Sequence, residues 1–191
     1  MGETHSSYRG VIHDWNVVVT SAPEGYRDAV RILRDFGEIA RTWFRDVLVM
    51  RVGHEVHEFQ EMLRELLEND ATLANSVSRI IPVTDKFAYS SAEEFREKAT
   101  EVVRPWAREL GGKTFYVRMH RRGFKDVLNS HAEERAMGQF LLECIEDDRS
   151  GTHVRFQDPD VVIAVETVGE DAGLSRWCRA DLDRYELLRL D

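Results

Sequence analysis

The sequence is poor in cysteine and proline, with two Cys and four Pro among 191 residues. Cys144 and Cys178 are too few for a disulfide scaffold, and their spacing fits no zinc-binding pattern. We expect both thiols to stay reduced, as thiols do in a cytosol. Disorder is excluded as the dominant state, because 42% of the residues are apolar and 32% are charged.

Long apolar runs are also missing, since none approaches the ~18 residues that a membrane span requires. The first seven residues are polar and do not resemble a signal peptide. We therefore expect a cytoplasmic protein with no membrane partner. The net charge of -9 excludes a uniformly basic nucleic-acid binder, although a local basic patch is compatible with it.

The first 90 residues alternate between strand and helix patterns. The apolar spacing predicts a β-α-β-β-α-β order, the ferredoxin-like arrangement. Gly37 is expected to close the first helix, Arg45-Asp46 to form a hairpin turn, and Pro82 to lie at an edge or bulge. The expected strands are 15–20, 39–44, 47–52 and 79–88, and the expected helices are 24–36 and 56–67.

The remaining residues predict a second α/β unit that begins after Ser90-Ser91. Ser91 and Glu94, like Ser130 and Glu133, have the spacing of a helix capping box. Pro105 should kink or divide a helix over 95–110. The expected strands are 114–120, 154–156, 161–168 and 174–178, a further helix covers 130–144, and turns fall at 158–160 and 169–173. The fold class is therefore α+β, with domains over 1–90 and 91–191.

Catalytic and metal-binding motifs are weak. Gly112-Lys113-Thr114 ends like a P-loop but lacks the first glycine and lies between a helix and a strand. His54 and His57 are three residues apart, whereas a zincin helix requires four. No Gly-x-Ser-x-Gly motif is present. We predict no catalytic residue, no metal and no cofactor.

One segment, residues 113–135, carries a local charge of +3 from six basic and three acidic residues. Alternation along a strand places Arg118, His120 and Arg122 on one face. The loop after Gly123 leads to the helix start at Ser130, where free amides suit a phosphate. The alternative is that these arginines pair with the acidic surplus of the chain. The candidate RNA-binding residues are Lys113, Arg118, His120, Arg121, Arg122, Lys125, Asn129, Ser130, His131 and Arg135.

Two stretches of this basic segment resemble the THUMP domain of RNA-modifying systems. They are Lys113-Thr-Phe-Tyr-Val-Arg-Met-His-Arg-Arg-Gly123 and Asn129-Ser-His-Ala-Glu-Glu-Arg135. Two later stretches resemble the later strands of that domain, namely Phe156-Gln-Asp-Pro-Asp-Val-Val-Ile-Ala-Val-Glu166 and Gly173-Leu-Ser-Arg-Trp-Cys178. The resemblance covers about residues 91–185 and implies binding of tRNA or another structured RNA. THUMP proteins usually carry a modifying domain on the same chain, for which this sequence leaves no room. It is therefore similar to the free-standing branch, a non-catalytic adaptor that presents tRNA to a separate cytidine acetyltransferase.

Two other classes of function stay open from the residues alone. Residues 136–191 carry six basic and thirteen acidic residues, so an acidic face could dock a basic protein partner without direct RNA binding. A small enzyme with an unrecognised carboxylate or histidine site is the third hypothesis.

Overall fold

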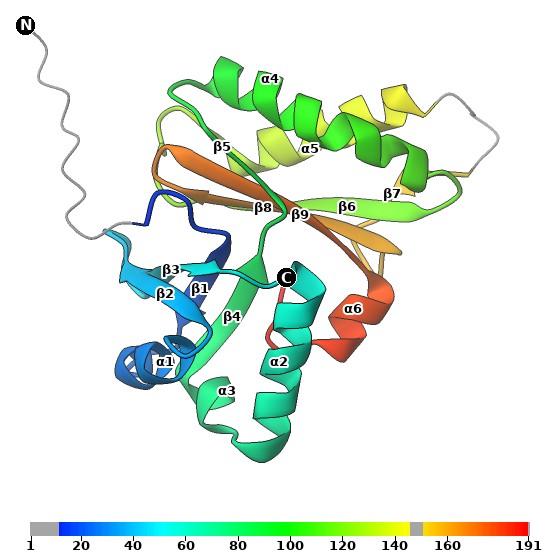
Figure 1. Cartoon of the computed structure of the whole chain (residues 1–191). Coiled ribbons are helices and arrows are strands. Elements are labelled where there is room, and N and C mark those ends of the chain that lie inside the picture. The colour runs from blue at the N-terminus through cyan, green and yellow to red at the C-terminus, as the bar shows by residue number, and fades with distance from the viewer. Residues whose placement is uncertain (1–11, 146–150, 191) are drawn as a thin grey trace, which may run out of the picture.

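The first of two β-sheets is antiparallel, with the strand order β2-β3-β1-β4. The computed structural model describes residues 12–145 and 151–190 (Figure 1). The observed element order is the predicted β-α-β-β-α-β, with a short additional helix before the last strand. Its elements are β1 (Val17–Ser21), α1 (Tyr26–Leu33), β2 (Gly37–Arg41), β3 (Val47–Val52), α2 (Val56–Asn69), α3 (Thr72–Ser76) and β4 (Val77–Pro82).

Helices α1 and α2 supply the core that covers this sheet. Val19, Met50 and Phe59 are almost fully buried in it. The carboxylate of Glu55 begins α2 by accepting the backbone N–H groups of His57 and Glu58. Each fully buried apolar side chain of this kind contributes about 1.5–3 kcal/mol relative to exposure.

Gly37 has a different role from the predicted one. Helix α1 ends at Leu33, and Gly37 begins strand β2. A Cβ at this position would lie 2.2 Å from the backbone oxygen of Arg51 on the neighbouring strand. The glycine is therefore required for close strand pairing and not for ending the helix.

The second sheet is mixed, with the order β5-β9-β8-β6-β7. Strand β6 is parallel to β7 and β8, whereas β9 is antiparallel to β8 and β5. Figure 1 shows α4 and α5 over one face of this sheet, with the first sheet on the opposite side. Its elements are β5 (Asp85–Ala88), α4 (Ala92–Val103), the 3-10 helix η1 (Arg104–Glu109), β6 (Thr114–His120), α5 (Ser130–Cys144), β7 (His153–Val154), β8 (Val161–Val168), β9 (Asp171–Cys178) and α6 (Arg179–Arg184).

The helix divided by Pro105 and the cap at Ser91 are confirmed. Helix α4 ends at Val103, and Pro105 lies in the 3-10 helix that follows. Ser91 Oγ accepts the N–H of Glu94 at 3.1 Å. The Glu94 carboxylate accepts the N–H of Ser90, one residue earlier than a standard capping box places it.

The predicted strands 15–20, 39–44 and 154–156 are shifted to Val17–Ser21, Gly37–Arg41 and His153–Val154, and two further predicted strands differ more. Residues 79–88 are not one strand, because Val83 N–H donates to Asn16 in the first sheet and Thr84 N–H donates to Leu174 in the second. The chain thus changes sheets between β4 and β5, and Pro82 ends the edge strand β4, as predicted. Strand β9 already begins at Asp171, so the expected turn over 169–173 shortens to Gly169 and Glu170.

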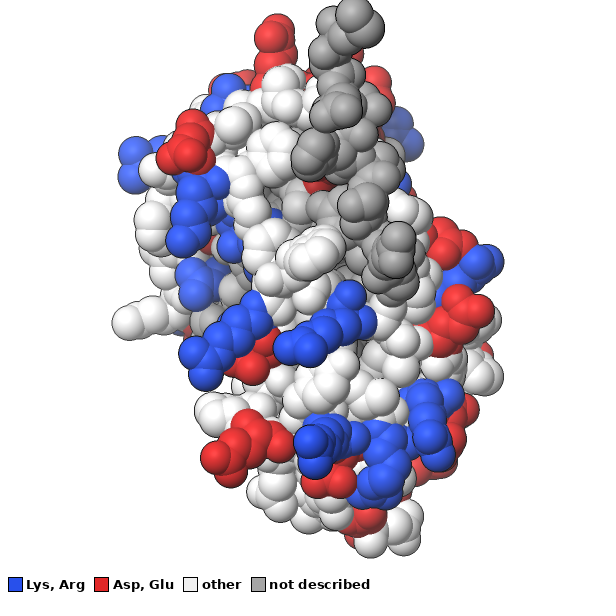
Figure 2. Space-filling view, turned by 90° about the vertical axis from the view of Figure 1, so that its left-hand side faces the viewer, with Lys and Arg blue, Asp and Glu red and all other residues white. Residues whose placement is uncertain are grey.

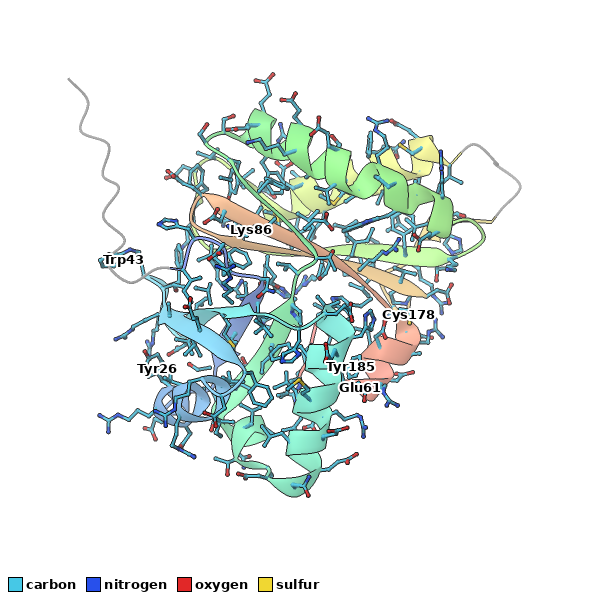
Figure 3. All side chains as sticks on the ribbon, in the orientation of Figure 1. Tyr26, Trp43, Glu61, Lys86, Cys178 and Tyr185 are labelled. Carbon is cyan, nitrogen blue, oxygen red and sulfur yellow. The ribbon has the colours of Figure 1, made fainter. Side chains whose placement is uncertain are left out.

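The C-terminal residues return to the first sheet. Ile80 N–H donates to the backbone oxygen of Leu187 at 2.8 Å, and Leu187 is buried in the core of the first sheet. Tyr185 donates to Glu61 of α2 at 2.8 Å (Figure 3). Strand β5 precedes residue 90 but belongs to the second sheet. Leu187 follows residue 91 but lies in the core of the first sheet. The expected boundary between residues 90 and 91 therefore does not separate the two sheets.

Both cysteines are free thiols, as predicted. Within residues 12–145 and 151–190, no helix is both long and apolar enough to cross a membrane.

Candidate nucleic-acid interface

The loop between β6 and α5 holds the centre of the predicted basic segment. Gly123 has φ +98°, a left-handed conformation that favours glycine. A Cβ there would lie 3.2 Å from both the Gly169 Cα and the Phe44 Cζ. The loop is consequently held against the β8–β9 turn and against the β2–β3 hairpin of the first sheet.

Strand β6 alternates as predicted, which places His120 on the face opposite α4 and α5. Phe115, Val117 and Met119 are buried beneath the helices. His120 and Arg122, which lies just beyond the strand, both turn toward Glu166 of β8. Arg118 does not join them, and its Nε is buried with no hydrogen-bond partner among the described residues.

Glu166 is fully buried and forms the centre of an ion-paired cluster. Arg122 Nη1 donates to Glu166 Oε2, and the Arg122 side chain is only 11% exposed. His120 Nδ1 lies 2.6 Å from Glu166 Oε1, and Arg79 Nη1 lies 2.6 Å from His120 Nε2. Because arginine only donates, His120 carries its proton on Nδ1 and donates it to Glu166.

Burial by itself raises the pKa of the Glu166 carboxyl. The charge of Arg122 and the hydrogen bond from His120 nevertheless hold that pKa below its ordinary value, so Glu166 is ionised. Arg122 Nη2 also donates to Thr20 Oγ1 of β1 at 3.1 Å. The cluster, which includes Arg79 from β4, therefore joins the two sheets. Arg122 is paired with an acidic residue, as the alternative interpretation of the basic segment predicted.

Arg121 and Lys125 have no carboxylate partner among the described residues. Lys125 is exposed, and Arg121 Nη1 donates to the backbone oxygen of Gly123 at 2.7 Å. The backbone oxygen is uncharged, so the positive charge of Arg121 is not neutralised there. Lys125 is therefore open to a phosphate, whereas Arg121 is half-buried and its Nε is buried with no hydrogen-bond partner among the described residues.

The start of α5 differs from the prediction in its N-cap residue and in the role of Glu133. Asn129, not Ser130, is the N-cap, and its Oδ1 accepts the N–H of Ala132 at 3.1 Å. Glu133 completes no capping box, because its carboxylate forms two hydrogen bonds with Arg96 of α4. Ser130 is the first residue of the helix itself.

The other candidate residues lie at separate places. His131 and Arg135 line a groove beside α5. Lys113 precedes β6, at the end of the strand remote from the loop, and lines a small hollow with His57 and Trp177. The structure therefore brings Arg121, Lys125 and Asn129 together around one loop and leaves Lys113 apart.

The β2–β3 hairpin contributes residues that sequence reasoning missed. Phe44 contacts the Gly123 loop, and its neighbour Trp43 is 74% exposed and points outward (Figure 3). Arg41 and Arg45 flank this tryptophan in the sequence. Figure 2, which views the side on which Trp43 lies, shows several basic side chains with acidic ones among them. The sequence does place a tryptophan between two arginines next to a predicted hairpin turn, and this pattern could have indicated a binding surface.

His57 Nδ1 lies 3.3 Å from Glu55 and its Nε2 lies 3.5 Å from Asp181, so both ring nitrogens face carboxylates. No group of three or more potential metal ligands occurs in residues 12–145 and 151–190.

Residues 89–176 match the family model of the THUMP domain. The protein therefore contains a THUMP domain, which spans the second sheet from just after β5 to within β9. No curated protein matches the chain.

Solved structures share the fold across both sheets. PH1313 from Pyrococcus horikoshii Ot3 has a TM-score of 0.53 and 15% identity, over 85% of this chain and 54% of that one. TrmN from Thermus thermophilus has a TM-score of 0.52 and 19% identity, over 85% and 44%. A 4-thiouridine synthetase in complex with RNA and bound ATP has a TM-score of 0.50 and 15% identity, over 86% and 42%. The chain spans about half of each of these proteins or less.

Proposed function

We propose that this chain is a non-catalytic RNA-binding protein, with tRNA as its RNA, that acts as an adaptor for a separate tRNA-modifying enzyme such as a cytidine acetyltransferase. The THUMP domain supports this proposal most directly. A structural neighbour solved as an RNA complex is consistent with it.

The Gly123 loop supplies the phosphate-binding groups in this proposal. Arg121 and Lys125 lie on the loop, and the first turn of α5 adds backbone amides. The hairpin with Arg41, Trp43 and Arg45 contacts the same loop through Phe44, so the first sheet extends the surface. His120 and Arg122 act differently, because their contacts with Arg79 of β4 and Thr20 of β1 join the two sheets.

Binding of labelled tRNA at several salt concentrations tests the RNA-binding part. Arg121→Ala with Lys125→Ala should weaken binding and reduce the salt slope by about 1.4–1.8, at roughly 0.7–0.9 per lost phosphate contact. Arg108→Ala with Arg189→Ala removes equal charge elsewhere and should leave the slope closer to that of the wild type. Equal effects of both pairs, or no tRNA binding by the wild type at low salt, contradict the proposed surface.

The adaptor role requires a second assay. Adding the chain to a purified cytidine acetyltransferase should increase tRNA acetylation, and the double loop variant should not. Turnover of tRNA by the chain alone contradicts the non-catalytic role. Salt-sensitive retention of a basic protein, with no RNA bound, favours the acidic interaction module instead.

A further inference from the structure

The imidazole of His120 lies between two charged groups that belong to different sheets. Its side chain is only 10% exposed. Nδ1 donates to Glu166 Oε1 of β8 at 2.6 Å, and Nε2 accepts from Arg79 Nη1 of β4 at the same distance. Figure 1 shows β4 running up toward the second sheet. The neutral ring therefore links β4 of the first sheet to β6 and β8 of the second.

This link requires the lone pair of His120 Nε2. A proton on Nε2 turns both ring nitrogens into donors, and arginine has no acceptor to offer them. The Arg79 guanidinium would then face an N–H group and a like charge at 2.6 Å. The hydrogen bond to Glu166 uses the other ring nitrogen and survives. Protonation consequently breaks the contact with the first sheet and keeps the one within the second.

The charges around His120 determine which group gives way. Glu166 of β8 is already paired with Arg122, and Arg118 lies two residues before His120 on the same face of β6. The single carboxylate thus already faces the guanidinium groups of Arg79 and Arg122, and an imidazolium adds a further positive charge. Excess charge of one sign is costly in a buried cluster. Arg79 is the cation that leaves, because it is half-buried and Arg122 is bound to Glu166.

We propose that His120 is a pH-sensitive switch at the junction of the two sheets. Neutral His120 binds Arg79 and holds β4 against the second sheet, whereas protonated His120 releases Arg79 and loosens the junction. The β2–β3 hairpin and the Gly123 loop lie on opposite sides of this junction and meet through Phe44, so their relative position would change with pH. The switch is a property of the fold and does not require the proposed RNA binding.

A double-mutant cycle of Arg79→Ala and His120→Ala, measured by unfolding in urea, tests the switch. Histidine side chains change charge between pH 5 and pH 8, so the cycle is run at both values. At pH 8 the two residues should be coupled by about 10- to 150-fold in the unfolding equilibrium constant, as for a hydrogen bond to a charged group. At pH 5 the coupling should fall to about twofold or less. Equal coupling at both pH values, or no coupling at pH 8, overturns the proposal.

His120→Gln is the conservative variant, because its amide can donate to Glu166 and accept from Arg79 but cannot be protonated in this range. Its coupling to Arg79 should persist at pH 5. His54→Gln is the matched control, since His54 lies on the surface beside Glu58, and it should leave the wild-type pH profile of the coupling intact. A His120→Gln variant whose coupling is lost at pH 5, as in the wild type, overturns the role of His120.

Spin labels on the two sheets measure the loosening directly. Glu38→Cys of β2 and Glu97→Cys of α4 are exposed positions, and Cys144→Ser with Cys178→Ser removes the native thiols. The distance distribution between the labels should broaden or shift from pH 8 to pH 5 with His120 present and stay constant with His120→Gln. An unchanged distribution in the His120 protein, or the same change in both proteins, overturns the switch.

Discussion

Arg121 and Arg122 are neighbours in sequence, yet their replacement by alanine should have opposite consequences. Arg122→Ala leaves the fully buried Glu166 carboxylate without its cation. Removing one partner of a buried ion pair typically costs about 3–5 kcal/mol. Because the hydrogen bond from His120 remains, we expect the lower end, about 3 kcal/mol. Arg121→Ala loses a contact with a backbone oxygen and should cost less than about 1 kcal/mol.

For a chain of this length, 1 kcal/mol lowers the melting temperature by roughly 2–4 °C. Arg122→Ala should therefore lower it by about 6–12 °C, and Arg121→Ala by much less. Melting followed by circular dichroism measures both, and tRNA affinity is measured well below the transition. Arg121→Ala should weaken tRNA binding in a salt-dependent manner while the fold stays intact.

Adding Glu166→Gln to Arg122→Ala provides the internal control. Once the carboxylate is neutral, the double variant should recover part of the lost stability, since the buried charge is the larger cost. A melting temperature for Arg122→Ala within about 2 °C of wild type would show that the pair is not buried as described. Equal destabilisation by Arg121→Ala would refute the division between stability and binding.

Three further predictions concern the loop, the helix start and acid. Gly123→Ala should destabilise the protein by about 1–3 kcal/mol, because Gly123 has a positive φ and lies close to the Gly169 backbone. Gly53 has open space around it, so Gly53→Ala should have little effect. Unfolding in urea measures the stability of both variants. Asn129→Ala should cost about 0.5–2 kcal/mol and Ser130→Ala less, by the same assay. Hydrogen bonds from Lys98 and Ser90 lower the pKa of Glu94 to about 2, and the pKa of Glu166 is also lowered. The stabilisation that these two ionised carboxylates give the folded state is therefore present above about pH 4.5 and lost toward pH 2. An unfolding free energy that does not change with pH in that window contradicts the prediction.

Much of the fold could be predicted because its signals are local. Pro105 divides a helix wherever the rest of the chain lies, and Ser91 can cap only the turn that follows it. The alternation of Phe115, Val117 and Met119 gave the buried face of β6. These features depend on residues a few positions apart.

The rest depends on partners distant in sequence. Val83 and Thr84 look like the middle of one strand, and only their partners Asn16 and Leu174 place them in different sheets. Gly37 has the position of a helix end, but the backbone of Arg51 decides its role. Arg122 and Glu166 are 44 residues apart, so nothing near Arg122 marks it as buried and paired.

The candidate site shows the same division. A basic segment, its loop and the helix after it were visible in the sequence, as was the THUMP resemblance now matched over residues 89–176. The contribution of Trp43 could not be predicted from the sequence, because only the contact between Phe44 and Gly123 brings the β2–β3 hairpin to the loop.

The return of Leu187 to the first sheet has a consequence for how the protein is made. The four strands of that sheet are complete once Pro82 has been synthesised, but their core lacks Leu187 until roughly a hundred residues later, about 5–20 s at typical synthesis rates. During that interval the backbone N–H of Ile80, on an edge strand, has no carbonyl from the tail to bond. A nascent chain that stalls before Leu187 has been synthesised should therefore expose this edge to chaperones.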